Sequence, residues 1–167
     1  MTARARQVRR GGNSNVPWFA FVAISSFGAV AAALVSQHVF AMQPCAWCVL
    51  QRLIFVAMGA FALLGLVWRG AAGGRVTGTF ALLLALCGVA TALWHHLVAA
   101  KSASCNLTFA DRVVTATQLD RLIPDVFEAR ASCADAVSLL GIPYAIWAAL
   151  MFAVCAIALI RVLRASM

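Results

Sequence analysis

Acidic residues, and charges of either sign, are scarce in this chain. Asp and Glu together number 5 among 167 residues, and charged residues make up only 11% of the sequence. A soluble globular domain carries about 25% charged residues, so the composition excludes an ordinary soluble domain. Every acid lies between positions 111 and 135, which leaves the rest of the chain without a pair of carboxylates for acid–base catalysis.

The motifs of several other protein classes are also missing. The sequence has no phosphate-binding glycine loop and no Ser/His/Asp arrangement. A haem-attachment motif requires histidine directly after Cys-x-x-Cys, and Val49 follows Cys48 here. His95 and His96 are adjacent, so on a helix they point to different faces, which argues against a shared haem or metal site. We therefore expect neither haem nor a bound metal.

Apolar sequence, in contrast, is abundant and comes in long runs. Hydrophobic residues make up 64% of the chain, against about 45–50% in a typical soluble domain. The runs that lack nearly all charge are 17–36, 45–68, 76–98 and 142–160. A helix needs about 20 residues to cross the hydrocarbon core, and only a helix satisfies its own backbone there. The sequence predicts an all-α integral membrane four-helix bundle, with Pro143 in the first turn of the fourth helix.

The arginines indicate how these helices are oriented. The tails at 1–16 and 161–167 and the linker at 69–75 contain arginines and no acid. Between them lie the short segment 37–44 and the long segment 99–141, which holds every acid. The positive-inside rule places both termini and the linker in the cytoplasm and the other two segments outside. The net charge of +8 therefore marks topology and contact with the lipid bilayer, and we expect no nucleic-acid partner.

The first apolar run has an alternative interpretation as a cleaved signal peptide. It follows a basic segment, and Ala31-Ala32-Ala33 resembles a cleavage site. The apolar region of a signal peptide has about 7–15 residues, and this run is longer. An uncleaved first helix is therefore expected.

The 6 cysteines fall into two groups. Cys87 and Cys155 lie within the third and fourth runs, where we expect them to be buried small apolar residues without chemistry. The other four lie on the outer side, where disulfides persist: Cys45, Cys48, Cys105 and Cys133. Their spacing lacks the two close pairs of a structural zinc site, so two disulfides are expected.

The expected disulfides, Cys45–Cys48 and Cys105–Cys133, differ in kind. A bridge across two residues closes a tiny loop and stabilises little, so its usual value is redox reactivity. The proline before Cys45 predicts a helix start there, where the helix dipole favours a thiolate; a staple between loop and helix is the alternative. Cys105–Cys133 is either a structural bridge or a mobile exchange disulfide. A partial apolar stripe at 119–127 predicts a short helix on the membrane surface.

A single charge lies inside the second apolar run. Arg52 follows Cys48 by four residues, so the two side chains share a helix face. Arginine in hydrocarbon is costly unless it snorkels or binds something. Two interpretations stay open. Arg52 is either an anchor at the outer headgroups, or a guanidinium that stabilises the Cys48 thiolate and donates to an anionic or carbonyl-bearing ligand.

These motifs resemble the disulfide bond formation protein B family of bacterial inner membranes. The first run that carries the resemblance is Gln37-His38-Val39 followed by Pro44-Cys45-x-x-Cys48-x-x-x-Arg52. The second is Pro124-x-x-Phe127 leading to Cys133, with Leu140-Gly141 and Pro143 after it. The likeness covers nearly the whole architecture, including the four spans, the cytoplasmic tails and the two external cysteine pairs.

The resemblance implies a quinone-dependent thiol-disulfide oxidoreductase. Such a protein reoxidises a periplasmic thioredoxin-fold oxidant, a DsbA-like protein, and passes the electrons to membrane quinone. It thereby sustains disulfide formation in secreted proteins. The resemblance further implies that Cys105 forms a mixed disulfide with the partner, that Cys133 then exchanges with Cys45, and that Cys48 faces the quinone.

The same resemblance implies where the electron acceptor binds. Ubiquinone or menaquinone would lie near Arg52 and near a histidine at the outer end of the third helix. For that histidine, His96 is the better match and His95 the competitor.

Two rival classes remain open on the sequence. A structural or assembly membrane protein with inert disulfides predicts that mild reductants leave Cys45–Cys48 intact. A vitamin K epoxide reductase-like protein also uses four helices and a Cys-x-x-Cys motif. In that family the motif ordinarily falls late in the chain, whereas here it comes early.

Overall fold

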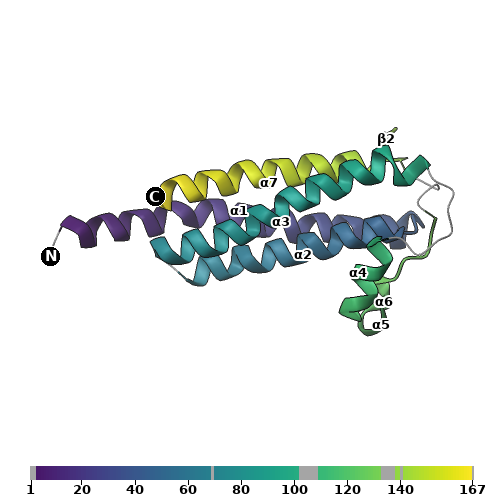
Figure 1. Ribbon diagram of the computed structural model, residues 1–167, viewed down its shortest axis with the longest axis horizontal. Helices are drawn as coiled ribbons and strands as arrows, with labels where there is room; N and C mark the ends of the chain where they lie inside the picture. Colours follow the sequence, from purple (N-terminus) through teal and green to yellow (C-terminus); the bar gives the residue numbers. More distant parts are fainter. Residues whose placement is uncertain (1–2, 69, 102–108, 133–137, 140, 167) are drawn as a thin grey trace.

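Each of the four apolar runs forms a long helix, because a segment in hydrocarbon has to satisfy its backbone hydrogen bonds within itself. The computed structural model describes residues 3–68, 70–101, 109–132, 138–139 and 141–166. Its long helices are α1 (Ala3–Val39), α2 (Ala46–Val67), α3 (Ala71–Leu97) and α7 (Tyr144–Ser166). All 4 contain a segment long and apolar enough to cross a membrane. They form the predicted all-α four-helix bundle (Figure 1).

α1, α3 and α7 extend beyond their apolar runs, whereas α2 stays within its run. α1 begins at Ala3, in the arginine-rich tail, and α3 begins at Ala71, within the expected linker. Arginine and alanine have high helix propensity, so hydropathy locates the membrane-crossing part of a helix and not its ends. The expected place of Pro143 is wrong, because it lies in β2 and α7 begins only at Tyr144. The helix starts after the proline because proline disfavours helical backbone in the residue before it.

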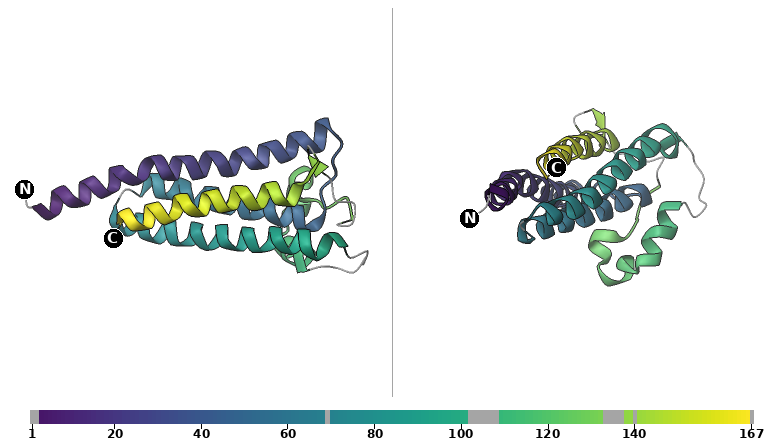
Figure 2. Two further views of the ribbon diagram at one scale, coloured as in Figure 1. Left: turned by 90° about the horizontal axis from the view of Figure 1, so that it is seen from above. Right: turned by 60° about the vertical axis from the view of Figure 1, so that its left-hand side comes forward.

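The helices contact one another in the cyclic order α1, α2, α3 and α7 (Figure 2). α3 turns a row of small residues to the interior: Ala81, Ala85, Gly88 and Ala92. Small residues let helix backbones approach closely within a membrane. The ring of Phe152 on α7 fills the space over Gly88 and stacks on Phe55 of α2, with ring centroids 3.8 Å apart. These contacts pack α2, α3 and α7 together next to the site described in the following subsection.

Both termini lie at one end of the bundle (Figure 1), where a buried polar cluster joins the helices. The side-chain amide of Asn15 on α1 donates to the Ser166 hydroxyl on α7 at 2.8 Å. Arg75 of α3 donates through Nε to the backbone carbonyl of Ser166 at 2.9 Å. The cluster therefore ties α1, α3 and α7 together where the chain enters and leaves the bundle.

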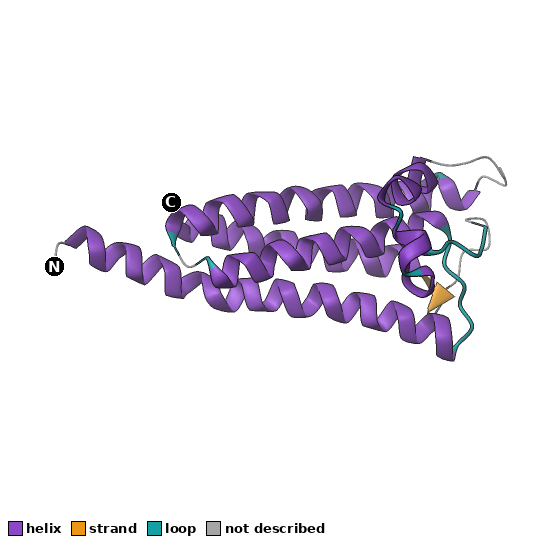
Figure 3. Cartoon of the chain, turned by 90° about the horizontal axis from the view of Figure 1, so that it is seen from below, coloured by secondary structure: helices purple, strands orange, loops and turns teal. Residues whose placement is uncertain are grey.

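The long segment between α3 and α7 covers the opposite end, which we call the loop end (Figure 3). Its described elements are the 3-10 turn η1 (Ala99–Lys101), α4 (Phe109–Thr117), α5 (Leu119–Leu122), α6 (Pro124–Phe127), β1 (Ser138–Leu139) and β2 (Ile142–Pro143). β1 and β2 pair as an antiparallel hairpin. Ala110, Val114 and Phe127 are buried in the core cluster, so α4 and α6 are anchored on the start of α2.

The apolar stripe at 119–127 is two short helices and not the single helix expected. α5 ends at Leu122, and α6 begins at Pro124. Ile123 between them has φ −137° and ψ 70°, outside the helical region, which a following proline disfavours. The break turns Phe127 into the core while Leu122 stays 72% exposed.

Candidate functional site

The first turn of α2 presents two thiols at the loop end. Cys45 is the N-cap residue in an extended conformation, and its carbonyl accepts the first helical bond, from Val49 N at 3.0 Å. Cys48 lies one turn further, and the two Sγ atoms are 3.1 Å apart. A closed disulfide measures about 2.05 Å, so a short movement would bring the two sulfurs to bonding distance. The predicted helix start near Cys45 is confirmed.

A strand-like stretch of the loop runs directly beside Cys45. The backbone N–H groups of Arg130 and Ala131 donate to the Pro44 carbonyl at 2.9 and 3.2 Å. Ala131 forms a parallel bridge with Cys45. Ser132 lines the same cavity as Cys45. The loop backbone is thus fixed against the cysteine pair.

The remaining four cysteines are not part of the pair at the start of α2. Cys105 and Cys133 lie outside the described residues, so their pairing and roles stay predictions. Cys155 is buried in the core on α7, as expected. The expectation that Cys87 is buried is wrong, because this residue is exposed on α3. The small-residue row occupies the inner face of α3, and position 87 lies off that row.

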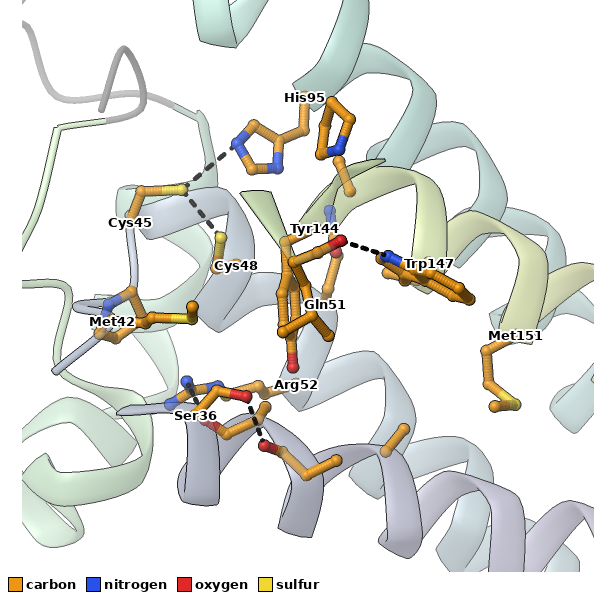
Figure 4. Close-up of a pocket in the computed structure, with 18 of the residues that line it drawn as sticks. Ser36, Met42, Cys45, Cys48, Gln51, Arg52, His95, Tyr144, Trp147 and Met151 are labelled. Atoms are coloured by element: carbon orange, nitrogen blue, oxygen red, sulfur yellow. Dashed lines mark hydrogen bonds between the residues drawn. The ribbon is translucent and has the colours of Figure 1, made fainter. Parts of the chain in front are cut away.

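Two histidines at the end of α3 lie beside the thiols. His95 is buried, and its Nε2 is 3.5 Å from Cys45 Sγ (Figure 4). It follows Ala92 by three residues and so continues the inward row of small residues. His96 is half-buried and lines the same cavity. His95 is the histidine that contacts the thiols, and which of the two lies beside a quinone stays a prediction, for which the family resemblance favours His96.

Arg52 is buried, with 6% of its surface exposed, and neutral oxygens hold its guanidinium. Nη1 donates to Gln37 Oε1 at 2.8 Å and to the Val126 carbonyl at 3.0 Å, and Nη2 donates to the Ala33 carbonyl at 3.4 Å. Gln37 in turn donates to the Asp125 carbonyl at 3.1 Å. Arg52 therefore joins α1, α2 and α6 inside the protein, which argues against the snorkelling interpretation.

One cavity of about 240 Å³ brings these groups together at the loop end (Figure 4). Its lining is mainly apolar, with side chains such as Val30, Phe55 and Met151. Every long helix contributes polar side chains to the lining, which are Ser36, Gln51, Arg52, His95, His96 and Tyr144, and the loops add Gln43 and Ser132. An apolar cavity with a few polar groups is the usual form of a small-molecule site.

Gln51 is a polar member of this cavity that the sequence analysis missed. It is 4% exposed, and its Nε2 meets no hydrogen-bond partner in the described part of the chain. A buried donor without a partner costs about 1–3 kcal/mol, so a ligand with an acceptor oxygen gains by meeting it. The signal available in the sequence was an amide beside Arg52 in an otherwise apolar span.

The fold and the site together define a class: a four-helix membrane protein whose paired thiols open onto an apolar cavity. The family profile for "Disulfide bond formation protein DsbB" matches residues 15–162. The chain belongs to this family. Membership makes it a multi-pass membrane protein with a disulfide oxidoreductase role in disulfide bond formation, as the sequence resemblance implied.

Curated relatives of the same family are similar to this chain over most of their length. Disulfide bond formation protein B of Ralstonia nicotianae is 32% identical over 152 residues, which cover 86% of this chain and 90% of the relative. The protein of the same name from Cupriavidus necator is 32% identical over 139 residues, or 78% and 81% of the two chains. That of Herminiimonas arsenicoxydans is 31% identical over 151 residues, or 89% and 94%.

Proposed function

We propose that the protein is a quinone-dependent thiol-disulfide oxidoreductase of the bacterial inner membrane. It takes two electrons from a reduced periplasmic thioredoxin-fold protein of the DsbA type and passes them to membrane quinone. The observation that carries the proposal is the shared cavity, which Cys45, Cys48 and the unpartnered amide of Gln51 all line. At the loop end of a membrane bundle, this site lies where a water-borne reductant and a lipid-soluble oxidant can both approach.

The cavity lining fits a quinone. A quinone ring is flat and apolar, and its carbonyl oxygens accept hydrogen bonds. Phe55 and Met151 supply apolar surface, while Gln51 and Arg52 supply N–H donors in the same lining. Closing the Cys45–Cys48 bond releases two electrons and two protons, and a quinone is an acceptor for both. Ubiquinone and menaquinone meet these requirements equally.

The thiol exchange begins in the loop. A thiolate of the partner attacks the Cys105–Cys133 disulfide at Cys105, and Cys133 leaves as a thiolate. Cys133 then attacks the Cys45–Cys48 disulfide at Cys45, which breaks that bond, forms a Cys133–Cys45 bond and releases Cys48 as a thiolate. The bridge between Ala131 and Cys45 supports this step, because the chain already reaches Cys45 two residues before Cys133.

Two further exchanges restore the loop. The second thiol of the partner displaces Cys105, so the partner leaves with a disulfide. Cys105 then attacks Cys133, which re-forms the loop disulfide and leaves Cys45 and Cys48 as the reduced pair. The two electrons lost by the partner are then held at the end of α2.

His95 and Arg52 assist the thiols. His95 Nε2, 3.5 Å from Cys45 Sγ, accepts the proton when that thiol becomes a nucleophile. Arg52 lies one turn after Cys48 and stabilises the negative charge on its sulfur. The neutral acceptors around the guanidinium leave its positive charge available for this purpose.

Steady-state turnover tests the proposal. The protein in detergent is mixed with a reduced thioredoxin-fold partner and a soluble quinone, and quinone absorbance is followed. We expect Cys48→Ala to abolish turnover, while the matched change Cys87→Ala on the outer face of α3 leaves it intact. Unchanged turnover in Cys48→Ala, or none in the native chain with an active partner, would instead favour a structural protein with inert disulfides.

A further inference from the structure

Three donors of the kind that bind soft metals converge at the cavity. The Sγ atoms of Cys45 and Cys48 and a ring nitrogen of His95 all lie within 4.8 Å of one another. Two thiolates and an imidazole are ligands that Zn²⁺ favours. We propose that the reduced protein binds one Zn²⁺ ion through Cys45, Cys48 and His95.

The distances are close to those of a tetrahedral zinc site. Bonds of about 2.3 Å to sulfur and 2.05 Å to nitrogen put sulfur and nitrogen about 3.6 Å apart, and two sulfurs about 3.8 Å apart. Cys45 Sγ and His95 Nε2 are 3.5 Å apart, so this sulfur–nitrogen distance already matches that of a zinc site (Figure 4). The sulfur pair, at 3.1 Å, has to open by about 0.7 Å, which rotation of the half-buried Cys48 side chain supplies.

The surroundings indicate an open site of moderate affinity. Cys45 and His95 are each 4% exposed, so two ligands are shielded from water. The cavity leaves the fourth coordination position for water, as in catalytic zinc sites. His95 Nδ1 has no hydrogen-bond partner among the described residues. Because such a second bond normally orients a metal-binding imidazole, we expect weaker binding than in structural zinc sites.

Zinc binding is tied to the redox state of the cysteine pair. Two thiols lose their protons when they bind the ion, and no electron is transferred. A closed Cys45–Cys48 disulfide offers no thiolate and does not bind. Zinc therefore holds the pair reduced and competes with its closure. That inhibitory consequence rests on the proposed function, whereas the binding itself does not.

A zinc titration tests the site. Cys105→Ala and Cys133→Ala are introduced first, to remove the loop thiols, and reduced and oxidised samples compete for Zn²⁺ with a coloured chelator. We expect one ion per reduced chain, and an affinity at least about tenfold lower after His95→Ala. The neighbouring change His96→Ala is the matched control and leaves the affinity unchanged.

The oxidised sample needs no change at the ligands, so it tests the proposal even if His95→Ala fails to fold. Equal zinc binding by oxidised and reduced samples would overturn the proposal. Full affinity in a folded His95→Ala chain would overturn it as well. Neither measurement involves quinone, so failure of the zinc site is distinguishable from failure of the proposed function.

Discussion

Arg52 is a buried cation whose hydrogen-bond partners among the described residues are an amide oxygen and backbone carbonyls. The planar guanidinium donates from Nη1 to Gln37 on α1 and the Val126 carbonyl on α6, and from Nη2 to the Ala33 carbonyl on α1. Lysine has a single point charge and cannot reproduce this forked arrangement. In the described part of the chain the salt bridges involve Arg130 and not Arg52. The charge of Arg52 is therefore not neutralised by an ion pair there.

Replacing Arg52 by lysine is expected to impair quinone use. The change keeps the positive charge but loses donors to buried acceptors, which costs about 1–3 kcal/mol. We expect KM for quinone to rise about tenfold or more, as measured by steady-state turnover. Arg130→Lys is the control, because that side chain is 39% exposed and pairs with surface carboxylates. Equal KM values in the two variants would contradict a binding role for Arg52.

Gln51→Leu is expected to weaken quinone binding without affecting the exchange of thiols. The substitution removes the buried N–H that meets no partner in the described part of the chain. We expect KM for quinone to rise about tenfold, since one hydrogen bond contributes about 1–1.5 kcal/mol. The rate at which the reduced partner forms its mixed disulfide should stay the same. A slower partner reaction with unchanged KM would show that Gln51 acts on the loop instead.

At the scale of helices, α3 links packing to chemistry. The row Ala81, Ala85, Gly88 and Ala92 is fully buried and ends in His95. The same spacing that lets α3 approach its neighbours therefore aims one histidine at the thiols. The spacing is visible in the sequence, so His95 could have been chosen over His96 as the neighbour of the thiols by extending the row.

Gly88→Ala is expected to destabilise the bundle. A Cβ at this position would overlap the ring of Phe152, which stacks on Phe55. Overpacking of this kind costs about 1–3 kcal/mol and should lower the melting temperature in detergent. Gly28→Ala is the matched control, because nothing lies within 4 Å of a Cβ built there. A smaller loss of stability in Gly88→Ala than in Gly28→Ala would contradict this packing.

The sequence predicted the helices of the bundle better than the contacts of the site. Hydropathy located the helices because membrane-spanning helices depend on local composition. Gln51 and the acceptors of Arg52 were missed because they depend on contacts between distant segments. The bond from Arg52 to Val126 joins residues 74 positions apart. The pairing of Ala131 with Cys45 is of the same kind.

At the scale of the whole molecule, the two ends of the bundle differ in chemistry. Both termini lie at one end of the bundle, and α4, α5 and α6 lie at the other (Figure 1). The cluster around Ser166 belongs to the first end, and the cysteine pair at the start of α2 and the cavity belong to the second. The arginine-rich segments are at the end with the termini. The positive-inside rule then predicts a cytoplasmic face for that end.

Cysteine labelling tests this orientation. In a chain whose native cysteines are replaced by alanine, Ile123→Cys places a thiol at a loop-end position that is 47% exposed. A membrane-impermeant maleimide added to intact spheroplasts should label it. Arg164→Cys, at an exposed position near the other end, should react only after the membrane is opened. The reverse pattern would contradict the predicted topology.

The most direct test of electron transfer from the thiols to quinone uses a single anaerobic turnover without the soluble partner. Protein with a reduced Cys45–Cys48 pair is mixed with excess quinone, in a chain that carries Cys105→Ala and Cys133→Ala. Quinone absorbance and the disulfide content, by mass spectrometry, are followed together. We expect one quinone reduced for each Cys45–Cys48 disulfide that forms. A Cys45–Cys48 pair that stays reduced in the presence of quinone would contradict the proposed function.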